Sequence, residues 1–187
     1  MDVPGLHRRM SEEFGRRVEA ISGDQWSLPT PNPEWDVRAL VHHLVYENVW
    51  TPPMLEGRTM EEVGDRFEGD ILGDDPKVAF TESSRVAVDA VAEPGAMERT
   101  VHLSFGDYPG SEYAMQLAAD HLIHAWDLAR AIGADERLDA ELVSALRGWF
   151  ESREEFYRQA GVIGPRPEIP DGADEQTTLL AMFGRLV

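Results

Sequence analysis

The sequence predicts an all-α protein, a four-helix bundle with long crossover connections and a little extended structure. Long segments carry apolar residues at spacings of three and four, as Leu6, Met10 and Phe14 do, which is the pattern of amphipathic helices. Prolines and glycines separate these segments. Residues 53–75 form a polar, Gly-rich connection, and long connections in compact domains are often functional. This order of helices fits an up-down-down-up bundle.

The individual elements follow from the same signals. Helices are expected over residues 6–21, 36–50, 76–92, 111–132, 138–159 and 175–185. Asp36 is the expected N-cap of the second helix, and Pro52 is expected to end it. Gly133 is the expected residue after the last turn of the fourth helix. A short helical piece is expected within residues 60–67. In residues 98–110, apolar and polar residues alternate, which predicts an extended segment followed by a turn.

Length, charge and composition limit the functional classes. A chain of 187 residues is expected to form a single domain over residues 1–187. A formal net charge of -18 argues against binding to nucleic acids or anionic membranes. No run approaches the roughly 18 to 20 apolar residues that span a bilayer, so we expect a cytoplasmic protein. Because the chain has no cysteine, thiol chemistry would need an external thiol.

Two predicted helices carry polar side chains on their apolar faces. In the second helix, Glu47 projects near the middle of the face formed by Leu40 and Leu44, with His43 at its edge and His42 pointing away. In the fourth helix, Asp120, His124 and Asp127 share a side with Leu117, Leu128 and Ala131. An acid in an apolar setting is costly unless it is paired or bound to a cation. Inward side chains from facing helices are also how bundles build metal sites.

Structural roles for the same residues remain open. Asp120 and His124 have the spacing of a hydrogen-bonded pair one turn apart. Glu47 is also consistent with a hydrogen-bond partner inside the bundle. Asp127 is equally consistent with an ion-pair partner of Arg130 and with a hydrogen-bond acceptor that orients an imidazole.

Other aromatic and histidine residues are interpreted as structural. Trp35 and Trp126 are interpreted as core or helix-junction anchors. His7 and His102 belong to no recognisable constellation and are assigned no role.

Two segments resemble the signatures of a known family. The segment DQWSLPTPNPEWDVRALVHHLV resembles PTPC-x-W-x-V-R-x-L-x-x-H-L, and DHLIHAWDLARAIG resembles D-x-x-x-H-x-W-D-L-A-R-A-x-G. Both signatures belong to the DinB-like metal-binding bundles related to the N-terminal domain of mycothiol-dependent maleylpyruvate isomerase. The terminal TTLLAMFGR resembles that group's LLA-x-x-GR ending, so the resemblance covers nearly the whole chain.

The resemblance implies a DinB-like four-helix bundle that holds a divalent metal. Matched position by position, His43, Asp120 and His124 are the implied ligands. Asp120 stands where the isomerase relatives have Glu, and a water or His121 is expected to complete the shell. Zinc is the preferred ion, with nickel, iron and manganese as alternatives.

Two departures limit the resemblance. Asn32 stands where the signature has Cys, which we interpret as a structural change at the turn. The isomerase also has a second, C-terminal domain that supplies a substrate-binding arginine, and we expect no such domain in a chain of 187 residues. Maleylpyruvate isomerisation is therefore not assigned.

The resemblance implies a metal-dependent transferase or isomerase that uses a mycothiol-type thiol on small electrophiles. Glu47 or Asp127 is the expected proton acceptor, and Arg130 or Arg185 is expected to meet an anionic group of the substrate or thiol. The alternatives are a metal-dependent hydrolase and a non-catalytic metal-binding or dimerising bundle. Exposure of Trp50 or Met54 would favour a homodimer.

Overall fold

The computed structural model describes residues 1–187 and confirms the all-α fold. The chain divides into two compact units, Met1–Ala134 and Asp135–Val187. The first unit contains the long helices α1 (Val3–Ala20), α2 (Val37–Leu55), α4 (Pro76–Val91) and α5 (Gly110–Ile132). The prediction of a single domain over the whole chain stays a prediction. No helix is long and apolar enough to cross a membrane.

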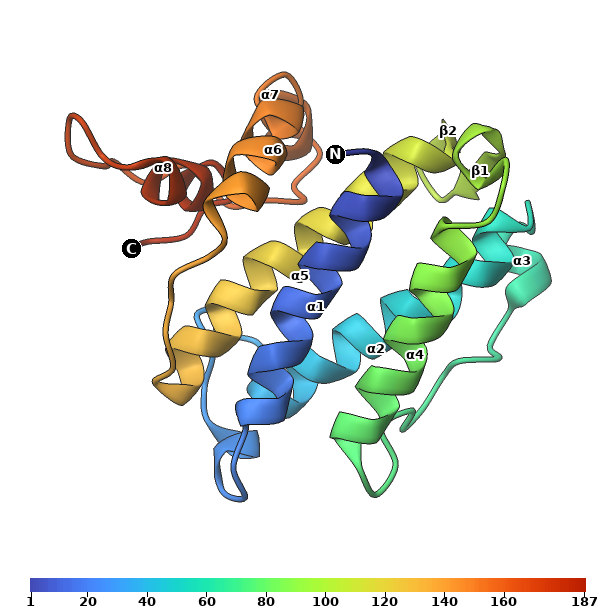
Figure 1. Cartoon of the computed structure of the whole chain (residues 1–187), viewed down its shortest axis with the longest axis horizontal. Coiled ribbons are helices and arrows are strands. Elements are labelled where there is room, and N and C mark those ends of the chain that lie inside the picture. The colour runs from blue at the N-terminus through green and yellow to red at the C-terminus, as the bar shows by residue number, and fades with distance from the viewer. The chain divides into compact units, whose positions relative to one another are not determined.

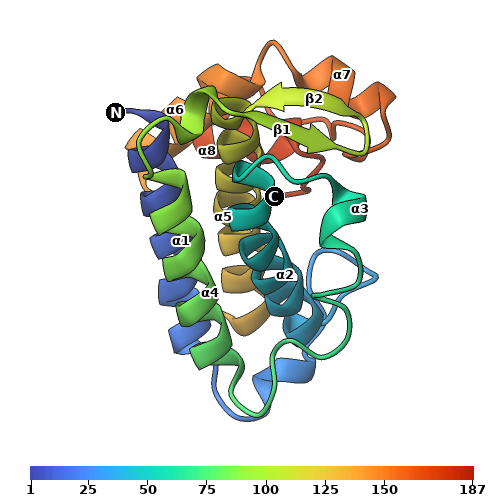
Figure 2. The same cartoon turned by 90° about the vertical axis from the view of Figure 1, so that its right-hand side faces the viewer.

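The four long helices form a bundle with the predicted direction pattern. Going along the chain, α1 runs down, α2 and α4 run up, and α5 runs down again (Figures 1 and 2). A long crossover joins the parallel helices α2 and α4 and contains the short helix α3 (Met60–Val63). This crossover lies along the outer side of α2, where His42 Nε2 is 3.0 Å from the Gly69 carbonyl oxygen. His42 therefore points out of the bundle, as predicted.

The beginning of α2 confirms one prediction and its end corrects another. The Asp36 carboxylate accepts a hydrogen bond from the Ala39 amide at 2.8 Å, which is the expected N-cap. The helix does not stop at Pro52 but continues to Leu55. Prolines inside a helix remove backbone hydrogen bonds, but burial of Met54 and Leu55 offsets that loss. The prediction that Pro52 ends the helix was wrong because tertiary packing outweighs the local preference.

A core cluster at the upper end of the bundle contains Trp50 and Met54, together with Val101 and Tyr113. Both Trp50 and Met54 are buried there. They are thus unavailable for the dimer surface that their exposure would have favoured. The homodimer itself stays a prediction.

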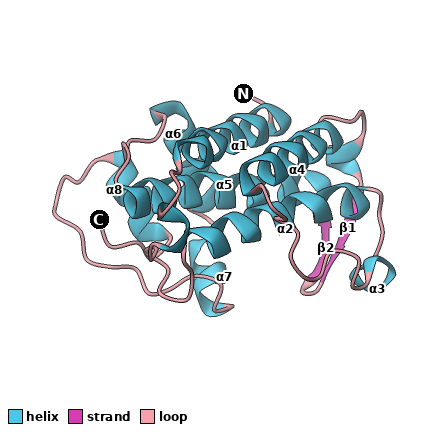
Figure 3. Cartoon of the chain, turned by 90° about the horizontal axis from the view of Figure 1, so that it is seen from below, coloured by secondary structure: helices cyan, strands magenta, loops and turns pink.

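The extended segment forms a single antiparallel hairpin, β1 (Thr100–Leu103) and β2 (Gly106–Pro109), with Val101 opposite Tyr108. Figure 3 shows that these are the only strands in the chain. The 3-10 turn η2 (Ala96–Glu98) precedes the hairpin, and another, η1 (Gln25–Ser27), precedes α2. Gly110 begins α5 where a Cβ atom would lie 2.0 Å from the Ala96 carbonyl oxygen, so only glycine fits this junction.

The second unit contains α6 (Ala140–Phe150), α7 (Glu154–Gln159) and α8 (Glu175–Met182). The predicted continuous helix over 138–159 was wrong, because α6 ends where the Arg153 amide bonds the Phe150 carbonyl oxygen at 2.8 Å in a tighter turn. The Phe150 ring stacks on Phe183 at 3.9 Å between centroids. Phe156 is 58% exposed.

A buried histidine pair lies between α1 and α5. The rings of His7 and His121 are 5.7 Å apart and nearly perpendicular, and the Phe14 and Phe80 rings also lie beside His121. Neither ring nitrogen of His7 has a hydrogen-bond partner. Burial, with the neighbouring His121, lowers the pKa of His7 to about 3. Burial likewise lowers the pKa of His121 to about 4, so both rings are neutral near pH 7.

We expect His7→Leu to make the free energy of unfolding less dependent on pH. The unfolded chain takes up a proton on His7 near its ordinary pKa of 6.5, whereas the native protein does so only near 3. Stability is therefore lost as the pH falls from above 6.5 towards 3. At pH 5 the variant should avoid about 2 kcal/mol of that loss.

Urea unfolding at pH 7 and pH 5 measures this difference. Met10→Leu, a change at a buried position without a titratable group, is the control and should shift stability equally at both pH values. Equal pH dependence of His7→Leu and the wild type would contradict the assignment of a neutral, unpaired His7.

Candidate metal centre

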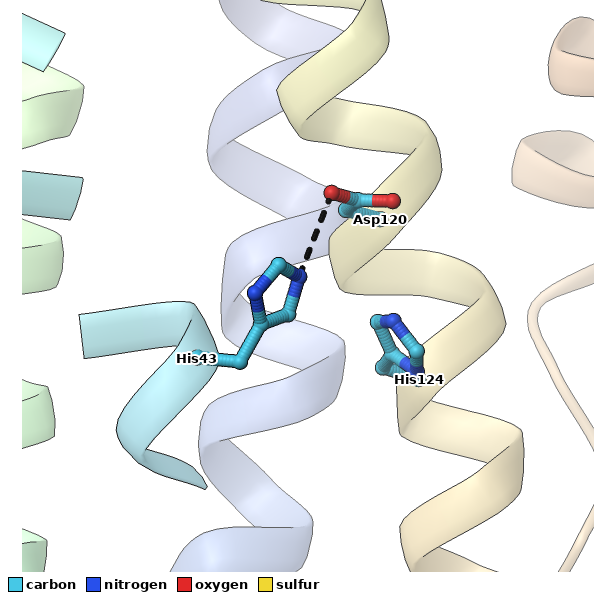
Figure 4. Close-up of side chains that lie close together, drawn as sticks. All are labelled: His43, Asp120 and His124. Atoms are coloured by element: carbon cyan, nitrogen blue, oxygen red, sulfur yellow. Dashed lines mark ion pairs between the residues drawn. The ribbon is translucent and has the colours of Figure 1, made fainter. Parts of the chain in front are cut away.

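Helices α2 and α5 bring His43, Asp120 and His124 together (Figure 4). One nitrogen or oxygen atom from each side chain lies within 4.8 Å of the other two. His43 Nε2 is 3.5 Å from Asp120 Oδ2. The three residues that the sequence singled out as ligands therefore converge on one point between two helices.

Helix geometry explains the convergence. Asp120 and His124 are four residues apart, so they lie on the same face of α5, one turn apart. Helix α2 runs opposite to α5 (Figures 1 and 2) and contributes His43 from the facing side. Because α5 is buried around most of its circumference, these polar groups must find partners inside the bundle.

Asp127 fixes the orientation of the His124 ring. His124 Nδ1 lies 2.8 Å from Asp127 Oδ2, and the Asp127 side chain is fully buried. The carboxylate is an acceptor only, so Nδ1 carries the hydrogen and donates it. This tautomer leaves the Nε2 lone pair of His124 available for a cation, as in the carboxylate–histidine–metal arrangement. Asp127 thus contacts an imidazole, which is one of its two predicted roles; the ion pair with Arg130 stays a prediction.

The cluster is enclosed on one side and open on the other. The side chain of His124 is 9% exposed and that of His43 is 24% exposed, whereas Asp120 retains 45% of its surface. Two imidazoles and one carboxylate without sulfur suit Zn²⁺, Fe²⁺ or Mn²⁺. Three protein ligands with one accessible side are typical of metal sites that keep a position for water or substrate.

The charges within the cluster are coupled. Burial alone would lower the pKa of His43, but the hydrogen bond and charge of Asp120, together with the charge of Glu47, raise it overall. Burial likewise opposes ionisation of Asp120, yet His43 and His124 hold the pKa of that carboxyl below its ordinary value. The mutual attraction of Asp120 and His43 thus favours the ionised carboxylate and the protonated imidazole. A bound metal ion would take the place of the proton.

Glu47 lies one turn after His43 on α2, outside the group of three. Burial raises the pKa of Glu47 to about 7, the charge of Asp120 acts in the same direction, and His43 opposes both. Burial and the charge of Glu47 also raise the pKa of Tyr113. A nearby dication would favour the ionised form of Glu47.

Three other predicted residues lie outside the cluster. His121 Nδ1 contacts the Leu117 carbonyl oxygen at 2.8 Å, so His121 belongs to the buried pair with His7 and does not complete the ligand set. The Arg130 guanidinium lies over the Trp126 ring at 4.9 Å, six residues beyond His124 or about 9 Å along the helix axis. Arg185 belongs to the second unit. The roles proposed for both arginines stay predictions.

Sequence reasoning missed the position of Trp35. Its ring lies 4.7 Å from that of His43 and 5.6 Å from that of His124. Trp35 therefore borders the cluster, although it was interpreted as a helix-junction anchor. The sequence signals were its place just before the helix that carries His43 and the tryptophan in the signature that this segment resembles.

A recess lies elsewhere, between α1 and α4. It has a volume of about 420 Å³, and its lining includes Arg8, Ser11, Phe80 and Arg85. None of the residues of the candidate metal centre lines it. The recess is thus separate from the polar cluster.

The chain is similar to known proteins over the part that contains the cluster. The mycothiol maleylpyruvate isomerase N-terminal domain family matches residues 7–129, a range that contains the whole cluster. Uncharacterized proteins from two strains of Mycobacterium tuberculosis are each 32% identical over 146 residues, covering 76% of this chain and 74% of the relative. No solved structure matches the chain.

We expect Asp127→Asn to weaken metal binding while the bundle stays folded. The amide can donate a hydrogen bond to His124 Nδ1 and so favour the tautomer with hydrogen on Nε2, which blocks the ligand atom. Affinity for Zn²⁺ should fall by roughly 10- to 100-fold. Competition with a chromophoric chelator measures it. Asp89→Asn, which removes an exposed carboxylate of α4, is the control. Wild-type affinity in Asp127→Asn would contradict this role.

Proposed function

The chain belongs to the mycothiol maleylpyruvate isomerase N-terminal domain family. We propose that it binds a divalent metal ion and either transfers a mycothiol-type thiol to small electrophiles or uses that thiol to isomerise them. The observation that carries the proposal is the convergence of His43, Asp120 and His124. Two imidazoles and a half-exposed carboxylate leave room for a substrate ligand, whereas a purely structural site is closed by a fourth protein ligand.

The proposed chemistry divides the work between the ion and the chain. A divalent ion with an open position, zinc being preferred, supplies Lewis acidity that favours a thiolate near neutral pH. His43, Asp120 and His124 would hold it, and Asp127 keeps the hydrogen on His124 Nδ1. The thiol must be a small molecule, because the chain has no cysteine. A cytoplasmic location, where small thiols stay reduced, is part of the proposal.

Proton transfer and substrate binding are assigned to residues around the cluster. The thiol proton goes to Glu47, whose ionisation is influenced by the charges of Asp120 and His43. The thiolate sulfur then forms a bond to carbon as the carbon–oxygen bond of an epoxide, the carbon–halogen bond of an alkyl halide or the π bond of an unsaturated acid breaks. The electron pair of the broken bond goes to oxygen, to the departing halide or to the acid's conjugated carbonyl group. Asp127 is fully buried and bonded to His124, so its part is to orient that ring. Arg130 and Arg185 are proposed to meet anionic groups of the substrate or thiol.

Metal content is the first test of this function. Wild-type protein, purified without an affinity metal and then incubated with Zn²⁺ and dialysed, should retain about one ion per chain by mass spectrometry. His43→Ala and the double variant Asp120→Ala/His124→Ala should retain little, because each removes ligands from a three-ligand set. His42→Ala, the neighbouring histidine that points out of the bundle, should behave as the wild type. Metal-free wild-type protein after incubation would rule out the proposal.

Turnover then separates an enzyme from a metal-binding protein. With epoxides and alkyl halides, zinc-loaded protein should consume mycothiol as a transferase; with unsaturated acids, it should convert the acid into its isomer without net loss of mycothiol. His43→Ala should do neither. Turnover of both the thiol and the electrophile no faster than with His43→Ala, for every compound of the panel, would favour the non-catalytic alternative.

A further inference from the structure

The loop before α2 is folded around Trp35. The Trp35 carbonyl oxygen accepts hydrogen bonds from the Thr30 amide at 3.1 Å and from Thr30 Oγ1 at 2.9 Å. The Trp35 amide donates to the Asn32 carbonyl oxygen at 3.1 Å. Pro29 and Asp36 form a bridge at the ends of the loop. The backbone on both sides of the indole is therefore fixed by contacts within the loop.

Asn32 also holds this turn. Its side-chain oxygen accepts a hydrogen bond from the Glu34 backbone amide at 3.2 Å. The backbone amide of Asn32 donates a hydrogen bond to Thr30 Oγ1 at 3.2 Å. Asparagine at this position thus supplies an acceptor that stabilises the turn locally. The result is a rigid loop that presents one large aromatic side chain.

The Trp35 ring touches both histidines of the candidate metal centre. It is inclined by 35° to the His43 ring and by 48° to the His124 ring, and the two imidazoles are 5.4 Å apart. The three rings form a closed triangle. Trp35 is only partly buried, so it forms the boundary between the cluster and solvent.

The two histidines differ in how much they depend on this contact. Asp127 already fixes the His124 ring through a buried hydrogen bond. His43 lies nearer the surface, with 24% of its side chain exposed, and its partner Asp120 is itself half-exposed. The Trp35 ring, 4.7 Å from the His43 ring, is therefore placed to limit rotation of that imidazole together with the contact to Asp120.

We propose that Trp35 is a positioning residue of the metal centre. It holds His43 in the orientation that points Nε2 towards Asp120, and it keeps water from the side that it covers. A metal ion held by the cluster would then be reached by water or substrate from the Asp120 side. This inference rests on the proposed metal binding. It adds that Trp35 limits how many water molecules can join the three protein ligands around the ion.

Cobalt binding tests the proposal through a readout other than activity. Co²⁺ with four or five ligands absorbs visible light much more strongly than Co²⁺ with six. Wild-type protein titrated with Co²⁺ should give the intense bands. Trp35→Ala and Trp35→Leu should give weaker bands, because additional waters enter, and an affinity lower by about 10-fold or more. Trp35→Phe should restore most of the intensity, because it restores an aromatic face.

Trp26→Ala is the matched control, since Trp26 lies in the turn Gln25–Ser27 of the same unit. It should keep the wild-type spectrum, and circular dichroism should show that each variant retains its helices. Wild-type spectra and affinity in Trp35→Ala or Trp35→Leu, or no recovery in Trp35→Phe, would overturn this inference alone. Absence of Co²⁺ binding by the wild type would overturn the metal-binding proposal and this inference with it.

Discussion

The packing of α2 against α5 is the constraint on which the candidate site depends. It places His43 Nε2 3.5 Å from Asp120 Oδ2 across the interface between two helices. One rigid helix, α5, already fixes Asp120, His124 and Asp127 relative to one another through its regular geometry. Only His43 has to be added from another helix. Any change that moves α2 along α5 would separate the cluster without altering either helix.

The surroundings make the two sides of the cluster unequal. Asp127 fixes His124 from the interior, and the Trp35 ring covers both imidazoles from the side. The Asp120 carboxylate remains half-exposed. Rigid support on one side and an accessible ligand on the other are what a reactive metal site requires, because the protein fixes the ion while a substrate or thiol can still reach it.

The sequence predicted the parts of the site that depend on regular helix geometry. The spacing of Asp120, His124 and Asp127 was sufficient to place them on one side of a helix, and Asp36 was recognisable as a cap from its position. Features that depend on tertiary packing were missed. Trp35 reaches the cluster through a loop whose shape depends on Thr30 and Asn32, and α2 passes Pro52 because the residues beyond it are buried. Similarly, only packing against α1 shows that His121 pairs with His7.

We propose that His43, Asp120 and His124 together hold one divalent ion with an open position. X-ray absorption spectroscopy of the zinc-loaded protein tests this most directly, because imidazole rings give a characteristic multiple-scattering signal. We expect two imidazoles and two or three oxygen ligands at about 2.0 to 2.2 Å from zinc. A spectrum with no imidazole contribution, or with only one imidazole, would contradict it.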